Sequence, residues 1–162
     1  MNSNLGIMIK ILENIDTWKC EYKKCGAKCC YEGIHLTIED IKRIKNLGYS
    51  PDDFLELDET VNVFKIKGKE GKCFFNGEKL ECTIRGNEPL VCRLLPFNIV
   101  EVSYSDEPMM KLKPVVDCPG VGLGKKIDKK SIEADATKFL HQNQKLIRDI
   151  KKKGKKGVLA DI

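Results

Sequence analysis

Apolar residues recur at helical spacing near both ends of the chain. Over residues 4–15, four of them fall on one face of a helix: Met8, Ile11, Leu12 and Ile15. Over residues 128–150, six form a longer stripe of the same kind: Ile132, Ala136, Phe139, Leu146, Ile147 and Ile150. The pattern predicts an N-terminal helix that packs into the core and a C-terminal amphipathic helix that covers a sheet. The lysine-rich segment 151–157 is interpreted as a frayed, solvated end.

Start signals predict two more helices in the first half of the chain. Thr37, with Asp40 three residues later, has the pattern of a helix N-terminal cap. The helix that follows turns four apolar residues toward the core: Ile38, Ile41, Ile44 and Leu47. Ser50 and Pro51 repeat the signal, with a capping side chain followed by a proline at the first helical position. We expect a second, short helix there that ends near Leu57.

The middle of the chain changes to the alternating and short apolar runs that are typical of β-strands. Such runs occupy five segments: residues 61–67, 72–75, 79–84, 97–104 and 109–116. The turn signal Asn76-Gly77 joins two of them, and the polar residues 105–108 join the last two as a hairpin with a packing role. The sequence therefore predicts an α+β fold, in which helices flank a small antiparallel sheet.

The length of 162 residues fits one domain. We expect it to extend over residues 1–162, with a cysteine-rich core motif at 18–124 followed by the C-terminal helix at 128–150. Hydrophobic residues make up 41% of the chain and charged residues 33%, which is the composition of a globular protein. The first residues lack the pattern of a secretory signal or transit peptide, and no apolar run is long enough to cross a bilayer. The expected location is cytoplasmic.

The eight cysteines are the strongest chemical signal in the chain. Four lie close together and four are dispersed: Cys20, Cys25, Cys29 and Cys30, then Cys73, Cys82, Cys92 and Cys118. In a reducing compartment thiols stay free unless a metal or a catalytic role claims them, although intracellular proteins of hyperthermophiles do form disulfides. Their neighbours are Lys, Arg, Gly and Pro, so burial as small hydrophobic residues does not explain all eight. We predict that all eight cysteines bind metal.

Four thiols are the usual ligand set of a zinc site and of an iron-sulfur cluster, so eight thiols suffice for two sites. Cys29 and Cys30 are neighbours whose side chains leave the backbone in different directions. Either one of the pair serves a second site, or a polynuclear cluster bridges the two. The spacings match neither the C-x2-C pairs of zinc ribbons nor the C-x2-C-x2-C run of bacterial ferredoxins, which leaves zinc and iron-sulfur both open.

Charged and polar neighbours bear on the same chemistry. Arg93, Lys28 and the glycine-rich stretch 119–124 lie beside cysteines, where they can stabilise thiolates or a reduced cluster. His35 and His141 are interpreted as packing or surface residues.

The formal net charge of +5 falls to about +1 when eight thiolates hold two divalent ions, because eight negative and four positive charges are added. That balance does not predict binding to nucleic acid, whereas a protein partner stays open.

Several motifs in a fixed order resemble a known family. They are W-x-C, CGAKCC, IHLTIEDIKRI, C-x8-C, PLVCRLLPF and CPGVGLG. The combination is similar to the YkgJ-type cysteine-cluster proteins, a family described as zinc- or iron-chelating domains, and it extends from Trp18 to the C-terminal helix. The resemblance implies that all eight cysteines match family positions and that the chain chelates a metal. It also implies that Arg93, Pro96 and Phe97 match the C-R-x-x-P-F element, with Arg93 as a cofactor-binding residue.

The chain departs from the family in the first cysteine group, where the usual spacing is close to C-x2-C-G-x-C-C. Here four residues separate Cys20 from Cys25, and three separate Cys25 from Cys29. The family often has an arginine directly before the proline of PLVCRLLPF, and here Glu88 stands at that position. Arg85 lies slightly earlier, and we expect it to do a related job from there.

Two classes of function fit these observations. The first is a metal-binding or iron-sulfur protein that acts as a carrier, an electron-transfer unit or an accessory module. It follows from a sequence that shows no Ser-His-Asp arrangement, paired acids or phosphate loop. The second is an enzyme whose metal or cluster takes part in redox or protein-modifying group transfer, which needs an open coordination position. The cysteine cluster is distantly similar to that of the flagellin lysine methylases, which bears on this second class.

Overall fold

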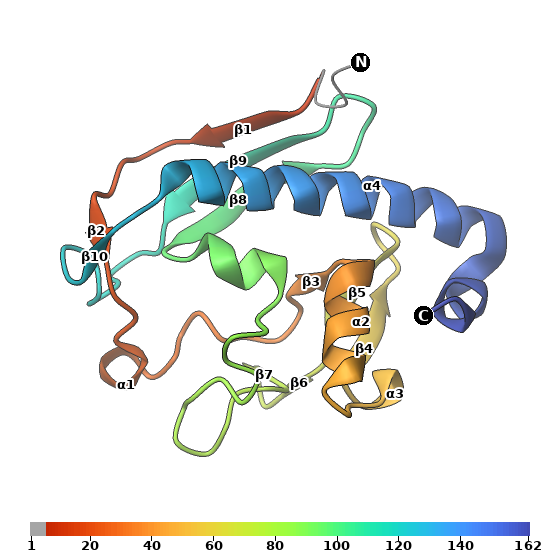
Figure 1. The fold of residues 1–162 in the computed structure, drawn as a ribbon, viewed down its shortest axis with the longest axis horizontal. Helices are drawn as coiled ribbons and strands as arrows, with labels where there is room; N and C mark the ends of the chain where they lie inside the picture. Colours follow the sequence, from red (N-terminus) through yellow and green to blue (C-terminus); the bar gives the residue numbers. More distant parts are fainter. Residues whose placement is uncertain (1–5) are drawn as a thin grey trace.

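The computed structural model of the protein describes residues 6–162 and shows an α+β arrangement (Figure 1). The described residues form four α-helices: α1 (Tyr22–Cys25), α2 (Ile38–Asn46), α3 (Pro51–Phe54) and α4 (Lys129–Ala160). A short 3-10 helix, η1 (Leu90–Leu94), precedes the longest strand. Small antiparallel sheets accompany these helices, which confirms the predicted fold class.

Within the same residues, the strands form four small sheets. The strands are β1 (Met8–Ile11), β2 (Thr17–Trp18), β3 (His35–Leu36), β4 (Leu55–Asp58), β5 (Val63–Ile66), β6 (Gly68–Lys69), β7 (Lys72–Cys73), β8 (Phe97–Ser103), β9 (Met109–Pro114) and β10 (Lys125–Lys126). Two sheets have three strands, in the orders β1-β9-β8 and β3-β5-β4, and two consist of one pair, β2 with β10 and β6 with β7. Every pairing is antiparallel except that of β1 with β9, which is parallel. β5 confirms the strand predicted at 61–67, and β8 with β9 confirms the second hairpin.

The N-terminal segment forms a strand, so the helix predicted over residues 4–15 is wrong; its first two residues lie outside the described part of the chain. β1 follows a period of two, because Ile7, Ile9 and Ile11 pack against the core while Met8 is 57% exposed. Three β-branched side chains at alternate positions favour a pleated strand over a helix. The backbone of β9 supplies the hydrogen-bonding partner that such a strand requires.

The N-terminal cap of α2 forms as the sequence predicts. The Thr37 hydroxyl accepts a hydrogen bond from the Asp40 N–H at 3.2 Å, and the Asp40 carboxylate accepts one from the Thr37 N–H at 2.9 Å. Both residues are fully buried, so water does not compete for these bonds. Ile41 and Ile44 lie in the core as expected, but Leu47 is 45% exposed because the helix ends there.

Asp40 also connects α2 to η1. Its Oδ1 atom accepts hydrogen bonds from Arg43 Nη2 at 2.7 Å and from the N–H of Leu90, the first residue of η1, at 3.1 Å. The Arg43 guanidinium continues the connection by donating to two backbone carbonyls just before η1. A buried carboxylate therefore fixes the segment that carries Cys92 against α2.

Two predicted elements differ in the middle of the chain. The short helix expected to end near Leu57 gives way to β4 at Leu55, because both leucines pair with residues of β5. The run 79–84, predicted as a strand, forms a loop whose only ladder contact is an isolated bridge between Asn76 and Cys82. This loop matters for the site, because it turns the chain back and returns Cys82 to the neighbourhood of β7.

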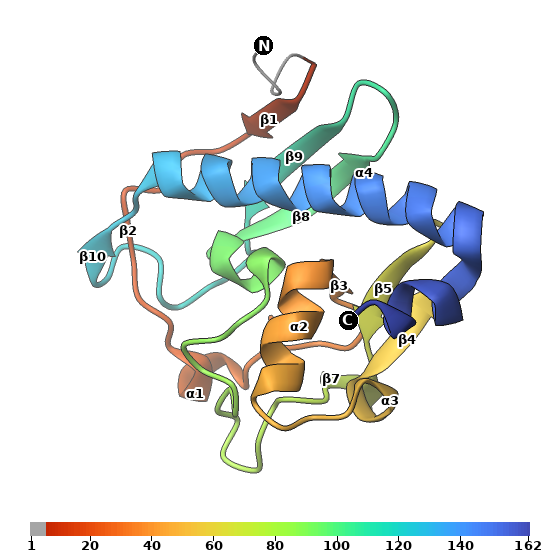
Figure 2. The same cartoon turned by 45° about the vertical axis from the view of Figure 1, so that its right-hand side comes forward.

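α4 confirms the predicted C-terminal helix and extends beyond it. Asp128 caps it by accepting a hydrogen bond from the Ser131 N–H at 3.2 Å. The segment 151–157 is helical apart from a break at Gly154, whose φ is 72°, so the expectation of a frayed end is wrong. After the break the chain turns back toward α2, and Val158 is buried (Figure 2). Neither α4 nor any other helix of the described residues is apolar over enough of its length to cross a membrane.

α4 lies across the sheet β1-β9-β8 and reaches both hydrophobic clusters of the core (Figure 1). The first cluster is formed by α2, the sheet β3-β5-β4 and the second half of α4. The second is formed by η1, the sheet β1-β9-β8 and the first half of α4. Val91 and Tyr104 pack against both clusters. The cysteine-rich loops adjoin the first cluster, because Cys73, Cys82 and Cys92 pack against it.

Replacing Asp40 with Ala is expected to destabilise the protein by about 3 kcal/mol, because the change leaves the donors of Thr37, Arg43 and Leu90 without their acceptor. Urea unfolding followed by circular dichroism measures the free energy of unfolding. The control is Glu59→Gln, at an exposed acid in a turn, for which we expect a change within about 0.5 kcal/mol. A loss below about 1 kcal/mol for Asp40→Ala would contradict the role given to this carboxylate.

Candidate metal centre

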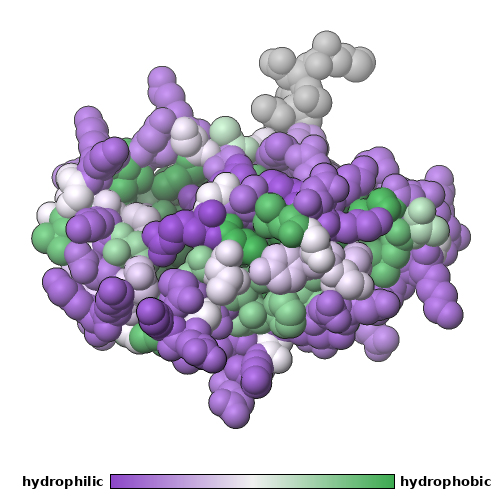
Figure 3. Space-filling view, turned by 60° about the horizontal axis from the view of Figure 1, so that its bottom comes forward, coloured by the Kyte–Doolittle hydropathy of each residue, from purple (hydrophilic) through white to green (hydrophobic). Residues whose placement is uncertain are grey.

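One cavity of about 440 Å³ is lined by six of the eight cysteines. They are Cys20, Cys29, Cys30, Cys73, Cys82 and Cys92. All eight cysteines are free thiols, so no disulfide competes for them. On the face of the molecule that bears the cysteine-rich loops, hydrophobic residues lie among hydrophilic ones (Figure 3). The fold therefore brings six cysteines that are scattered along the sequence to one cavity.

The other two cysteines, Cys25 and Cys118, do not line this cavity. Burial raises the pKa of the Cys20 and Cys29 thiols, and the thiols of Cys25 and Cys118 raise it further. Cys118 Sγ also accepts a hydrogen bond from Trp18 Nε1 at 3.3 Å. Sequence reasoning assigned no role to Trp18, although the W-x-C motif was the signal for it.

Backbone pairing brings Cys20 to Cys118. The Lys19 N–H donates to the Gly120 carbonyl at 3.1 Å, and next to this bond β2 pairs with β10. A Cβ atom at Gly120 would lie 1.8 Å from the Lys19 carbonyl oxygen, so only glycine fits there. The glycine-rich stretch 119–124 therefore permits a close approach of two backbones, which is a different role from the stabilisation of thiolates expected from the sequence.

A second backbone pairing brings Cys30 to Cys73. The Cys73 N–H donates to the Cys30 carbonyl at 3.1 Å, beside an isolated bridge between neighbouring residues. The loop 76–82 returns Cys82 to the same place, since its first and last residues are bridged. Cys92 arrives from η1, which the buried carboxylate of α2 holds in position. Three separate segments therefore supply these four thiols.

The cavity wall between the cysteines is largely apolar. Its apolar side chains include Ile34, Ile66, Phe75, Ile84 and Leu95. Burial in these surroundings raises the pKa of the Cys29 and Cys73 thiols to about 11, and that of Cys92 well above its ordinary value. Thiols in this cavity are therefore protonated at neutral pH until a metal or a cluster displaces their protons.

Two arginines bring positive charge to the cavity wall, Arg85 and Arg93. Burial raises the pKa of the Cys20 and Cys82 thiols, and the charge of Arg85 partly offsets this rise in both. The Arg85 guanidinium lies 5.3 Å from the centroid of the Tyr22 ring. Sequence reasoning put Arg93 first as the cofactor-binding residue, whereas the structure gives Arg85 the electrostatic contact with two thiols. Two signals for Arg85 were present in the sequence, its place shortly before PLVCRLLPF and its position three residues after Cys82.

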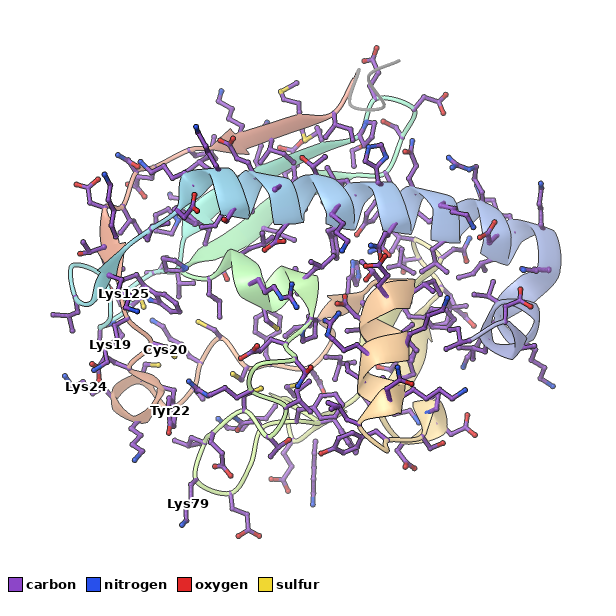
Figure 4. All side chains as sticks on the ribbon, viewed as in Figure 1. Lys19, Cys20, Tyr22, Lys24, Lys79 and Lys125 are labelled. Atoms are coloured by element: carbon purple, nitrogen blue, oxygen red, sulfur yellow. The ribbon has the colours of Figure 1, made fainter. Side chains whose placement is uncertain are left out.

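Lysines lie on the same side of the molecule as the exposed Cys20. Figure 4 shows Lys19, Lys24 and Lys125 there, and Lys79 lower down, below Tyr22. Glu21 offsets part of this charge, since its carboxylate oxygens lie 3.8 Å from the Nζ atoms of both Lys19 and Lys24. Lys28, which the sequence placed beside the thiols, instead donates to the Val116 carbonyl.

The chemistry of the gathered side chains fits a thiolate-bound metal. Cysteine thiolates are the common ligands of structural zinc and of iron-sulfur clusters. Among the described residues that line the cavity, Glu88 is the one acid and none is a histidine. Within residues 6–162, however, no three Cys, His, Asp or Glu side chains are arranged to hold one ion as they stand. Ligation by these thiols therefore requires their loops to close further around the bound group.

Neither histidine lines the cysteine cavity. His35 Nδ1 is 3.1 Å from the Tyr104 hydroxyl, and His35 Nε2 is 3.2 Å from Asp58 Oδ2. Both ring nitrogens of His35 are therefore engaged by protein groups, as expected for a packing residue. His141 lies on α4.

Replacing Arg85 with Gln is expected to slow the alkylation of Cys20 by iodoacetamide about twofold or more in metal-free protein. Loss of the guanidinium charge raises the pKa of that thiol, and only the thiolate reacts. Peptide mass spectrometry follows the modification of each cysteine over time. Lys24→Gln is the control, because Lys24 is a nearby cation that pairs with Glu21. Equal slowing in the two variants would show that Arg85 has no special position.

Comparison with known proteins bears on the same residues. One protein family matches residues 19–119: CxxCxxCC, described as "Putative zinc- or iron-chelating domain". No curated protein matches the chain, and no solved structure does. The matched segment contains all eight cysteines and both cavity arginines. Because it covers more than half of the chain, the chain belongs to the CxxCxxCC family of zinc- or iron-chelating domains.

Proposed function

We propose that the cysteine cavity binds an iron-sulfur cluster and that the protein acts as a carrier, an electron-transfer unit or an accessory module. The observation that carries this proposal is the convergence of six cysteines, from separate segments, on one cavity of about 440 Å³. Family membership supports the coarser part of it, chelation of zinc or iron. The choice of a cluster depends on the size, the lining and the charge of the cavity.

The size of the cavity favours a cluster over a single zinc ion. Four thiolates at about 2.3 Å from one zinc ion leave no space between the sulfurs. A cluster instead places iron and sulfide atoms between its thiolate ligands. The thiols here surround an open space with a largely apolar wall. No three of them are arranged to hold one ion. Apolar surroundings also limit the access of water, on which the potential of a cluster depends.

The two arginines suit the charge of a cluster. A cluster held by four thiolates carries a net negative charge, and reduction adds to it. Arg93 lies in the cavity wall, and Arg85 interacts favourably with the thiolates of Cys20 and Cys82. Positive charge beside the thiolates stabilises the reduced cluster. Hydrogen bonds to the sulfurs and burial also set the potential of cluster sites.

A carrier or electron-transfer role fits the cavity better than catalysis does. Among the described residues that line it, none is a His, Ser, Thr or Lys, which leaves Glu88 and the thiols themselves as the groups that could act as a general base or nucleophile. Cys20 is exposed, so electrons or a cluster can pass to a protein partner at that side. The alternative is a cluster-dependent enzyme for redox or protein-modifying group transfer, and it needs a coordination position open to substrate. An abundance of thiols works against such an opening, because a free thiol nearby would occupy it.

Anaerobic purification with analysis of metal and sulfide tests the cluster directly. We expect a brown protein that contains iron and acid-labile sulfide and whose broad visible absorption bleaches on reduction with dithionite. A colourless protein with stoichiometric zinc would keep the chelation and overturn the cluster. If neither metal copurifies and thiol titration finds paired disulfides, chelation itself is wrong.

Metal loading is expected to weaken steeply as the pH falls. Because burial raises the pKa of Cys29 and Cys73 to about 11, these thiols are protonated in the metal-free protein at neutral pH and release protons on ligation. Up to about four protons should leave for each Zn²⁺ ion that is held by four thiols. Isothermal titration calorimetry in buffers of different ionisation enthalpy counts these protons. Release of fewer than about one proton per ion would contradict ligation by neutral thiols.

A further inference from the structure

We infer that residues 17–28 and 116–126 form a docking surface for an acidic protein, through which the proposed carrier or electron-transfer role reaches its partner. The two segments together are called the basic surface. The inference rests on that proposed function and adds to it the place and the chemistry of the contact. Trp18 and Cys20 belong both to the basic surface and to the lining of the cysteine cavity, so a protein that docks there lies beside the cavity.

Backbone hydrogen bonds hold the two segments of the basic surface against each other. The Lys19 N–H donates to the Gly120 carbonyl at 3.1 Å, and the Gly122 N–H donates to the Thr17 carbonyl at 3.0 Å. β2 pairs with β10 beside these bonds. The surface therefore has a defined shape in the absence of a partner, which reduces the entropic cost of binding.

Three exposed apolar side chains extend from the second segment of the basic surface. Val116 is 70% exposed, Val121 40% and Leu123 42%. They are three of the nine large hydrophobic side chains that are exposed in the described part of the chain. Val121 forms a backbone bridge with Trp18, so it is exposed although its backbone is paired. Exposed apolar groups that lie close together in this way are typical of protein contacts.

The basic surface also carries most of the positive charge of the chain. Its six lysines are all exposed, and it has two acids: Lys19, Lys23, Lys24, Lys28, Lys125 and Lys126, with Glu21 and Asp117. The carboxylate of Glu21 lies 3.8 Å from the Nζ atoms of Lys19 and Lys24. The remainder of the chain contributes only one of the five net positive charges. Such a concentration of charge attracts an acidic protein and orients it during docking.

The pattern fits an acidic protein rather than a nucleic acid. The carboxylates of Glu21 and Asp117 lie among the lysines, where they repel a backbone of regularly spaced phosphates. Single strands bind largely through bases that stack on aromatic rings. The two aromatic rings of the basic surface are already engaged, because Trp18 lines the cavity and Arg85 lies 5.3 Å from the centroid of the Tyr22 ring.

A synthetic acidic peptide tests the basic surface without knowledge of the natural partner. The probe is a fluorescein-labelled peptide rich in aspartate and glutamate that also carries leucine and phenylalanine. Its anisotropy is measured against the full chain, purified anaerobically with its thiols reduced. We expect saturable binding that weakens at least about tenfold when the salt concentration rises from about 0.02 M to about 0.3 M. A Kd above about 1 mM at the lower salt concentration would overturn the inference.

Two double variants with the same change of charge locate the binding. Lys19→Glu with Lys125→Glu reverses two charges of the basic surface, and it should weaken binding of the peptide at least about tenfold. Lys151→Glu with Lys155→Glu reverses two exposed charges of α4, and it should weaken binding less than about threefold. Equal weakening in the two double variants would overturn the inference, because net charge alone would then explain the binding.

A second matched pair tests the apolar side chains. Leu123→Gln should weaken binding of the peptide at least about threefold, because it removes an apolar contact from the docking surface. Leu47→Gln is the control, since Leu47 is 45% exposed at the end of α2 and lies outside the basic surface. An unchanged affinity for Leu123→Gln, or tighter binding of a single-stranded oligonucleotide than of the peptide, would contradict docking of a protein.

Binding of the peptide does not require a bound metal, so failure of this inference can be told apart from failure of the proposed function. A chain that contains a cluster but does not bind the peptide keeps the function and overturns the docking surface. A chain that purifies without metal or sulfide, yet binds the peptide at the basic surface, supports the docking surface and contradicts the function.

Discussion

Long-range backbone pairing is the constraint on which the proposed metal centre depends, because its thiols come from segments far apart in the chain. Two hydrogen bonds of 3.1 Å establish it, from the Cys73 N–H to the Cys30 carbonyl and from the Lys19 N–H to the Gly120 carbonyl. Closing such long loops costs conformational entropy before any two thiols meet. Packing of the hydrophobic clusters and the buried contacts of α2 offset that cost. The fold therefore gathers the thiols while they are still neutral, and the proposed ligation would require them to come closer together.

The parts of the fold that were predicted correctly depend on residues close together in the sequence. The cap formed by Thr37 and Asp40 is one, and the β8–β9 hairpin and most of α4 are others. The errors arose where a distant partner decides the structure. β1 is a strand because β9 lies beside it, and segment 151–157 stays helical because Val158 beyond it packs on the first cluster. The alternation of Ile7, Ile9 and Ile11 was a local signal for β1, but no local pattern of apolar residues shows the packing of Val158.

The proposed metal centre shows the same difference between features set by residues close in sequence and features set by distant partners. Residue type and sequence context were enough to propose the cysteines as ligands, because eight thiols among polar neighbours are too many to be buried as small hydrophobic residues. Binding of metal by thiols from distant segments requires them to converge, but which of them share one cavity could not be predicted, since that depends on tertiary pairing. The role of Trp18 comes from a contact with Cys118 that is distant in sequence. A role for Arg85 was expected, but its interaction with the distant Cys20 was not. The adjacent pair at the end of CGAKCC was ambiguous for the same reason.

α4 packs its first half on the second hydrophobic cluster and its second half on the first. Neither cluster can lose its packing without exposing part of the same helix, so their unfolding is coupled. A molecule made of small, separate sheets should for this reason melt in one cooperative transition. Free energy gained when a ligand binds beside the first cluster is then shared by the whole fold, including strands that make no contact with the cysteines.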